Sequence, residues 1–280
     1  MDNSVFTPEQ VLEKIMQAGE KRILLPVLRC ILLGIMAGGF IAFGGATSSV
    51  AAHQVSNVGI ARLVTAVVFP VGLMMIVMVG GELFTGDCLI VTGLWDKRYG
   101  IGKMIRVLTV VWISNLIGSV LIAALVSGSG IFDYSAGGMG AFVIKTAYGK
   151  CTIGPMRAFI SGILCNILVC AAVLISTAAK DAVGKLMGVF FPIMAFVVAG
   201  WEHSVANMFY LPAGIFAAHH SAYVQKAQER YGLTTQQIQQ HVNLSGFFGN
   251  ILPVTLGNIV GAMVCMALPL YLARKKNHKV

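Results

Sequence analysis

Charged residues are scarce in this sequence of 280 residues: Asp, Glu, Lys and Arg make up 11% of it, whereas 57% is hydrophobic and the mean hydropathy is +0.81. Because a solvated surface needs more charge than this, the sequence predicts a polytopic membrane protein. There is also no C-x-x-C pair, glycine-rich phosphate loop, nucleophile elbow or pair of intramembrane aspartates. His219, His220 and His241 lack the spacing of metal ligands. These absences predict no metal site, no cofactor and no enzyme.

Six stretches are long and apolar enough to span a bilayer, which takes roughly 20 residues. Four are uninterrupted, at residues 23–45, 107–127, 158–178 and 247–274, and two carry polar interruptions, at 61–95 and 185–218. We expect residues 1–22 to form an amphipathic interfacial helix, because Thr7-Pro8-Glu9 is a helix-start signal that precedes one apolar face. The domains expected are this helix, a six-helix channel domain at 23–274 and a basic cytoplasmic tail at 275–280.

The basic residues predict the orientation. With six spans and a cytoplasmic N-terminus, 13 of the 20 lysines and arginines fall on the cytoplasmic side, in agreement with the positive-inside rule. We therefore expect a multi-pass protein of the inner (plasma) membrane with both termini in the cytoplasm. Since the net charge of +9 is spread over membrane loops and the tail, it predicts no nucleic-acid partner.

The two polar interruptions lie at residues 82–87 and 202–207. Charges at bilayer depth cost from about 2.5 kcal/mol upward, so such residues normally line or support a protected path. Three correspondences in sequence order indicate an internal repeat: Gly34 with Gly162, Glu82 with Glu202, and Asn115 with Asn258. Each repeat has three crossings, so the second copy is inverted. The predicted fold class is an all-α membrane protein of six transmembrane helices in two inverted three-helix repeats, with helices 2 and 5 broken.

His203 is the strongest candidate for a pore residue. A titratable ring in an apolar zone can donate to an anion or transfer a proton, although it could also bond a backbone carbonyl at the break. Asn207, four residues later, would share its helix face. Thr85 either donates its hydroxyl to a permeant or caps the half-helix that follows, and Asp87 could equally be that cap. We expect Glu202 to be structural.

Lys150 lies in a predicted outer loop, where a lysine either is merely solvated or attracts anions to a vestibule. Bulky apolar side chains flank both interruptions. They either pack against neighbouring helices or form dry constrictions that exclude hydrated ions. These residues are Phe69, Leu73, Leu83, Phe84 and Phe196.

Three motifs together resemble the formate/nitrite transporter family: Phe84-Thr85-Gly86, the E-H-S-x-A-N-M run from Glu202 to Met208, and the run from Pro253 to Asn258. The resemblance extends over nearly the whole chain. It implies a homopentamer with one pore per subunit, an aquaporin-like fold, and passage of small monovalent anions such as formate, nitrite or hydrosulfide.

Position by position, the resemblance implies that His203 is the central pore residue, that Thr85 lies on a loop able to occlude the cytoplasmic side, and that Lys150 polarises the outer vestibule. Asn166 and Glu202 match buried polar residues that support this lysine and the second break. Asn258 matches an asparagine near the central histidine. The apolar constrictions match Phe69, Leu73, Phe84 and Phe196. Two departures are Trp201, where phenylalanine is expected, and the polar loop 225–243, which has no counterpart.

The expected function is passive or proton-coupled passage of a small monovalent anion, attracted by Lys150, desolvated between apolar rings and met by His203 and Thr85. Two other classes stay open. An aquaporin-like channel for water or neutral solutes would carry two Asn-Pro-Ala signatures, and this sequence has none. An intramembrane enzyme would need a catalytic pair. The sequence does not name the anion, because discrimination by about one heavy atom is worth only ~1–3 kcal/mol.

Overall fold

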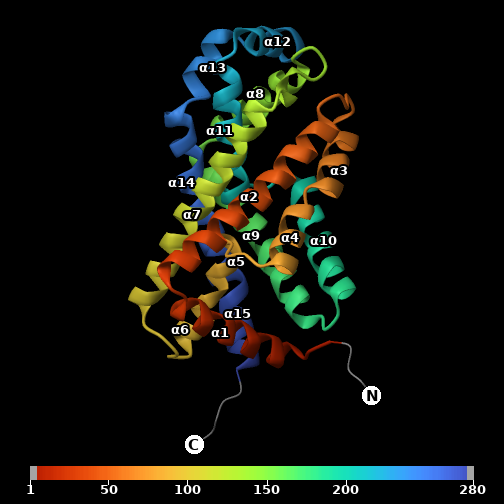
Figure 1. Cartoon of the computed structure of the whole chain (residues 1–280). Helices are drawn as coiled ribbons and strands as arrows, with labels where there is room; N and C mark the ends of the chain where they lie inside the picture. Colours follow the sequence, from red (N-terminus) through yellow and green to blue (C-terminus); the bar gives the residue numbers. More distant parts are fainter. Residues whose placement is uncertain (1–4, 276–280) are drawn as a thin grey trace, which may run out of the picture.

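A computed structural model describes residues 5–275, and the regular structure in that range is helical apart from one isolated bridge between Val5 and Ala179. Both termini lie at one end of the molecule, called here the terminal side (Figure 1). The short helices α12 (Ser221–Tyr231) and α13 (Thr235–His241) cover the other end, called the opposite side. These helices occupy the segment expected to be a polar loop. Most of the basic tail, residues 276–280, lies outside the described residues.

Six helical stretches are long and apolar enough to cross a membrane, which confirms the all-α membrane class and the number of spans. They are α2 (Val27–Ala52), α3 (Val58–Val68) with α4 (Val71–Val79), α7 (Ile101–Gly128), α9 (Pro155–Ala178), α10 (Ala182–Ala199), and α14 (Leu244–Val260) continued by a π-helical stretch, η3 (Gly261–Ala267), and α15 (Leu268–Arg274). The first span differs from the expected 23–45. It begins after Pro26, because proline interrupts the helix, and it runs on to Ala52.

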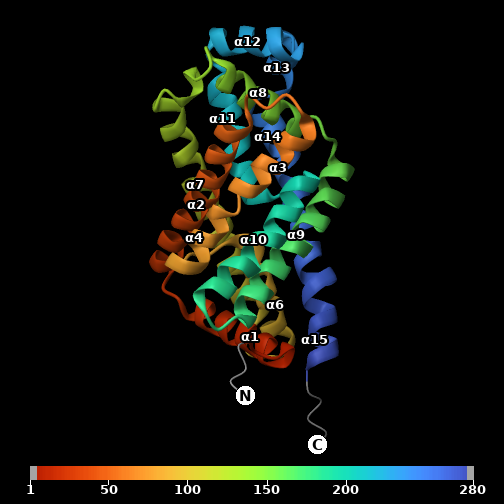
Figure 2. The ribbon, with the colours of Figure 1, turned by 90° about the vertical axis from the view of Figure 1, so that its right-hand side faces the viewer.

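An amphipathic helix precedes the first span, and a shorter, more uniformly apolar helix precedes the fourth. The first, α1 (Pro8–Leu24), begins as the sequence predicts, with a capping box between Thr7 and Gln10, and it lies across the terminal side (Figures 1 and 2). The second, α8 (Gly138–Cys151), is an element that the sequence did not suggest. Lys150 lies in its last turn, so its expected place in a loop is wrong.

The helices stop at both polar interruptions. After α4 the chain is non-helical from Gly80 and resumes as α5 (Phe84–Asp87), a 3₁₀ turn η1 (Cys88–Ile90) and α6 (Val91–Trp95). After α10 it is non-helical until α11 (Ser204–Ala218). A glycine with positive φ follows each preceding helix, Gly80 at 99° and Gly200 at 77°, and this conformation is easily adopted only without a Cβ.

Small residues bring the spans into contact. A Cβ on Gly38 would collide with the backbone of Asn115, and one on Gly257 would collide with the backbone of Phe159. The pairing of α2 with α7 and of α9 with α14 therefore depends on glycine, as the spacing of small residues predicts.

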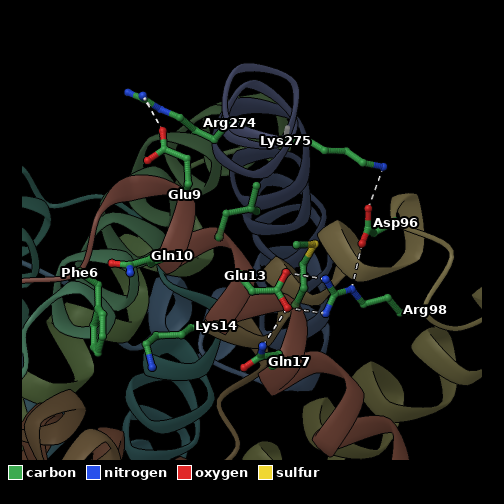
Figure 3. Close-up of a pocket in the computed structure, with 12 residues that line it drawn as sticks. Phe6, Glu9, Gln10, Glu13, Lys14, Gln17, Asp96, Arg98, Arg274 and Lys275 are labelled. Carbon is green, nitrogen blue, oxygen red and sulfur yellow. Dashed lines mark hydrogen bonds and ion pairs between the residues drawn. The ribbon is translucent and has the colours of Figure 1, made fainter. Parts of the chain in front are cut away.

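Ion pairs fasten α1 to the rest of the terminal side (Figure 3). Arg98, in the loop after α6, donates to both carboxylate oxygens of Glu13 at 3.0 and 2.6 Å and to Asp96 at 2.9 Å. Lys275 pairs with Asp96 at 2.7 Å, and Arg274 pairs with Glu9 at 3.1 Å. The hydrogen bonds from Arg98 hold the pKa of Glu13 below its ordinary value. This network, called the terminal clamp, joins α1, the 96–98 loop and the end of α15.

Candidate functional site

One asparagine supports each non-helical segment. Asn115 of α7 accepts a hydrogen bond from the backbone N–H of Phe84 at 2.9 Å, and its amide donates to the carbonyls of Gly34 at 2.8 Å and Glu82 at 2.9 Å. The side chain is fully buried. It therefore satisfies backbone groups that a broken helix leaves without partners.

Asn258 of α14 does the same for the second segment. It accepts from the N–H of Ser204 at 2.9 Å and donates to the carbonyls of Gly162 at 2.8 Å and Glu202 at 3.1 Å. The bonds made by the two asparagines match the sequence correspondences group for group. They also assign Asn258 to supporting the backbone beside the histidine, and it lines neither of the cavities described below.

The expected side-chain caps at the first interruption are absent. Neither Thr85 nor Asp87 caps α5, whose first N–H groups have no side-chain cap from the N-cap residue Leu83. Asn115 takes that role from a different helix. At the second interruption His203 itself is the N-cap, because its Nδ1 accepts a hydrogen bond from the N–H of Ala206 at 3.0 Å. The sequence suggested a bond to a carbonyl instead.

This cap fixes the chemistry of the imidazole. Since Nδ1 accepts a backbone N–H, the neutral ring carries its proton on Nε2. Nε2 lies 2.8 Å from the hydroxyl oxygen of Thr85, to which it donates. Both side chains are buried, with His203 2% exposed and Thr85 fully enclosed. The contact joins the two interruptions and leaves the hydroxyl proton of Thr85 for another acceptor.

A cavity approaches this contact from each side. The opposite-side cavity, of about 350 Å³, reaches His203 and is also lined by Lys150 and Asn207. The terminal-side cavity, of about 870 Å³, ends at Leu73 and Leu83. The His203–Thr85 contact therefore lies between two cavities that approach it from different ends of the molecule.

Apolar rings surround the contact. Phe196 stacks on His203 with ring centroids 5.9 Å apart, and Phe69 meets Phe196 edge-on at 5.9 Å. Both rings line the opposite-side cavity, and Leu73 and Leu83 line the terminal-side cavity. Phe84 is buried and lines neither. The structure thus places four of the five expected constriction residues in the lining of the two cavities.

Lys150 forms the centre of a polar group on the opposite side. Its ammonium donates to Glu202 at 2.9 Å and lies over the ring of Tyr210. The other carboxylate oxygen of Glu202 accepts from Asn207 at 2.6 Å. Asn250 donates to the same oxygen at 3.3 Å and to the carbonyl of Lys150 at 2.9 Å. We call Lys150, Glu202 and Asn207 the opposite-side triad.

Asn166 does not contact Lys150, so it does not support that lysine directly. Its amide donates to the carbonyls of Thr85 at 3.2 Å and Asn258 at 2.7 Å. It therefore joins the first interruption to α14. The support for Lys150 that the resemblance assigned to Asn166 comes from Asn250, which lies in an apolar stretch of the sequence.

A second ionic group lies on the terminal side. Nε of Arg22, at the end of α1, contacts Glu82 at 2.5 Å and Asp87 at 3.0 Å. The Asp87 side chain is 2% exposed. We call Arg22, Glu82 and Asp87 the terminal-side triad. The sequence indicated the two carboxylates but not their partner, because Arg22 lies 60 residues before Glu82.

Similar sequences are known, and they indicate the family. The sequence model of a family described as formate/nitrite transporter matches residues 9–272. A probable formate transporter of Methanothermobacter thermautotrophicus is 36% identical, over 95% of this chain and 96% of its own length. The formate channel FocA of Haemophilus influenzae is 36% identical over 84% of this chain and 83% of its own length.

Two solved structures have a similar fold. A pentameric formate channel with formate bound superposes with a TM-score of 0.77 at 30% identity, over 89% of this chain and 98% of that one. An ion channel of the FNT family superposes with a TM-score of 0.80 at 27% identity, over 94% and 98% of the two chains.

Proposed function

This chain belongs to the formate/nitrite transporter family, and we propose that it is a membrane channel or transporter that passes small monovalent anions, with formate as the first candidate. The observation that carries the proposal is the hydrogen bond between His203 and Thr85, 2.8 Å long and enclosed by apolar side chains between two cavities. A hydroxyl donor polarised by a buried imidazole in a dry zone suits a small anion better than a neutral solute.

The path begins at the opposite-side cavity, where Lys150 concentrates anions. The apolar rings of Phe69 and Phe196 then exclude water, so that the anion loses its hydration shell. Leu73 and Leu83 form the second dry zone toward the terminal side. Because a bare charge in such a zone is costly, the permeant crosses it held by donors or as the neutral acid.

The donors are Thr85 and His203. In the neutral ring with its proton on Nε2, His203 polarises the Thr85 hydroxyl, which donates its own proton toward the anion. Proton-coupled passage would need the His203 ring first to take up a proton on Nδ1, giving up its bond from the Ala206 N–H, and then to pass its Nε2 proton through the Thr85 hydroxyl to the anion of a weak acid. Nitrite and hydrosulfide are further candidates, because both are small anions of weak acids.

We also propose that the fold is two inverted three-helix repeats with the second and fifth membrane helices broken. The hydrogen bonds of Asn115 and Asn258 support this, because each asparagine bonds one N–H and two carbonyls at corresponding positions. The helices α1 and α8 would then be the interfacial starts of the two repeats, and α1 would form the interfacial domain.

The assembly that we propose is a homopentamer in lipid, with one path per subunit, after the pentameric formate channel that this chain resembles. The distribution of lysine and arginine supports a cytoplasmic location for the terminal side and insertion in the inner (plasma) membrane. The protein would transport its substrate without converting it chemically.

Flux measurements in proteoliposomes test the function. Formate, nitrite and hydrosulfide are compared with water and glycerol, and we expect anion flux well above the lipid background with little glycerol flux. Water or glycerol flux without anion flux would instead establish a neutral-solute channel and overturn the proposal.

Two substitutions separate the roles of His203. His203→Phe removes the Nε2 donor and the cap on α11, whereas His203→Asn keeps a side-chain acceptor for the Ala206 N–H. We expect both variants to lose the pH-dependent selectivity between acid and anion, and only His203→Phe to lose stability as well. Wild-type pH dependence of transport between pH 5 and 8 in both variants would contradict proton donation by this residue.

A further inference from the structure

The two triads occupy corresponding places but differ in charge. Glu82 corresponds to Glu202 through the matched asparagine bonds, and Asp87 corresponds to Asn207, five residues later in each segment. One cation neutralises one carboxylate in the opposite-side triad. In the terminal-side triad, one cation faces two carboxylates.

The second carboxylate is poorly compensated. Nε of Arg22 is the nearest guanidinium nitrogen to both Glu82 and Asp87, and the second oxygen of Asp87, Oδ2, is buried with no hydrogen-bond partner among residues 5–275. Within that range Arg22 is the only cation within 4.0 Å of either carboxylate. A buried charge with an unpartnered oxygen is expensive, and a bound proton removes both the charge and the unsatisfied acceptor.

We propose that Glu82 and Asp87 form a site that holds one proton between them, and that this proton controls access of anions from the terminal side. The inference rests on the proposed anion transport for its functional part only. With the proton bound, the terminal-side triad has the same formal charge as the opposite-side triad. Without it, the extra negative charge borders the terminal-side cavity, which Glu82 and Arg22 line, and repels an approaching anion.

Other titratable groups lie near the pair or near its neighbours. Arg22 of α1, Cys30 of α2 and Cys88 of η1 interact with the carboxylates themselves. Tyr99, in the loop after α6, lies near Arg22, Arg106 of α7 lies near Cys30, and Cys170 of α9 lies near Cys88. Arg106 donates to the carbonyl of Ile23 and not to either carboxylate. Lys14, Lys180 and Lys185 line the cavity further out. These cations attract anions into the cavity, and the carboxyl pair decides whether the triad beside them is neutral or negative.

The direction of the pH effect follows. Lowering the pH on the terminal side protonates the pair and raises anion flux from that side by about tenfold between pH 8 and pH 5.5. Formate is a suitable probe, because carboxyl pKa values lie near 4 and formate stays almost fully ionised throughout this range. Lowering the pH on the opposite side changes nothing at this site.

Two reciprocal substitutions test the proposal. Asp87→Asn gives the terminal-side triad the composition of the opposite one, and we expect formate currents in planar bilayers to be about tenfold higher than wild type at pH 8 and independent of terminal-side pH. Asn207→Asp adds a carboxylate to the other triad and should create a pH dependence on the opposite side. Sidedness is assigned from protease access to a tag on the C-terminus. Wild-type pH dependence on the terminal side in Asp87→Asn overturns the proposal, as does the absence of a new dependence in Asn207→Asp.

An infrared titration keeps this test independent of transport. The wild-type protein should show absorption by a protonated carboxyl group at pH 6 that titrates away on raising the pH and is missing in Asp87→Asn. A wild-type spectrum with no such band means that the pair holds no proton, whatever the protein transports. A band that is present in a protein without anion flux would uphold the proton site and reject the proposed function.

Discussion

The two helix interruptions have the same kind of backbone support but different side chains at corresponding positions. An asparagine from the third or the sixth span holds each in place, yet the residue before the new helix is Leu83 in one and His203 in the other. The second residue of the new helix is Thr85 in one and Val205 in the other. Each interruption therefore contributes one polar group, and the two groups meet across the molecule at 2.8 Å. The backbone support is therefore alike at both interruptions, whereas one supplies the imidazole and the other the hydroxyl.

The largest effect is expected from removing the cation of each triad. Arg22→Met leaves two buried carboxylates without a cation, whereas Lys150→Met leaves only Glu202. We expect a loss of about 3–5 kcal/mol in the free energy of unfolding for Arg22→Met and about 2 kcal/mol for Lys150→Met, because the second change leaves one buried carboxylate without its cation and the first leaves two. Unfolding of the detergent-solubilised protein measures both. The exposed pair of Lys226 with Glu229 gives a control, Lys226→Met, with almost no change. A larger loss for Lys150→Met than for Arg22→Met would mean that the triads do not differ in the way their charges indicate.

The two asparagines provide a test of the symmetry itself. Asn115→Ala and Asn258→Ala each leave one N–H and two carbonyls without their side-chain partner, so both should destabilise the protein by about 2–3 kcal/mol. We expect the two losses of unfolding free energy to be similar. Ser114→Ala is the control, since the Ser114 hydroxyl bonds only a carbonyl of its own helix. Losses that differ by more than twofold would show that the interruptions are not supported alike.

Much of the fold could be predicted from the sequence, because lipid imposes a simple rule on composition. The six spans follow from apolar length, and their ends shift by a few residues where proline or a preceding helix intervenes, as at Pro26. The α8 helix was missed because it is short and only weakly amphipathic, with a glycine beside Lys150. Its place before the fourth span is the same as that of α1 before the first, so the sequence correspondences that indicate a repeat were the signal that could have found it.

The site was predictable residue by residue but not in its connections. His203, Thr85, Lys150 and Glu202 stand out because each is polar within an apolar stretch. Their partners do not, since a hydrogen bond between helices leaves no trace in local spacing. Arg22 looks like an ordinary basic residue at the end of an amphipathic helix.

The smallest expected effect concerns the terminal clamp, which holds the helix that carries Arg22 and has no ionic counterpart on α8. Glu13→Gln removes the charge that Arg98 contacts twice, and because Glu13 is partly exposed we expect α1 to lose about 0.5 kcal/mol of docking free energy. Hydrogen exchange of the α1 amides should then be about twofold faster.

The pKa of Glu13 is lowered by Arg98 from the ordinary 4.5, so its contribution is complete above pH 4.5 and is lost as the pH falls through the lower folded-state value. Wild-type exchange should therefore approach that of Glu13→Gln only in acid. Glu229→Gln, at the exposed pair with Lys226 on α12, is the matched control and should leave exchange of the α1 amides like the wild type. Unchanged exchange in Glu13→Gln would mean that α1 is held by its apolar face alone, and that the clamp does not position Arg22.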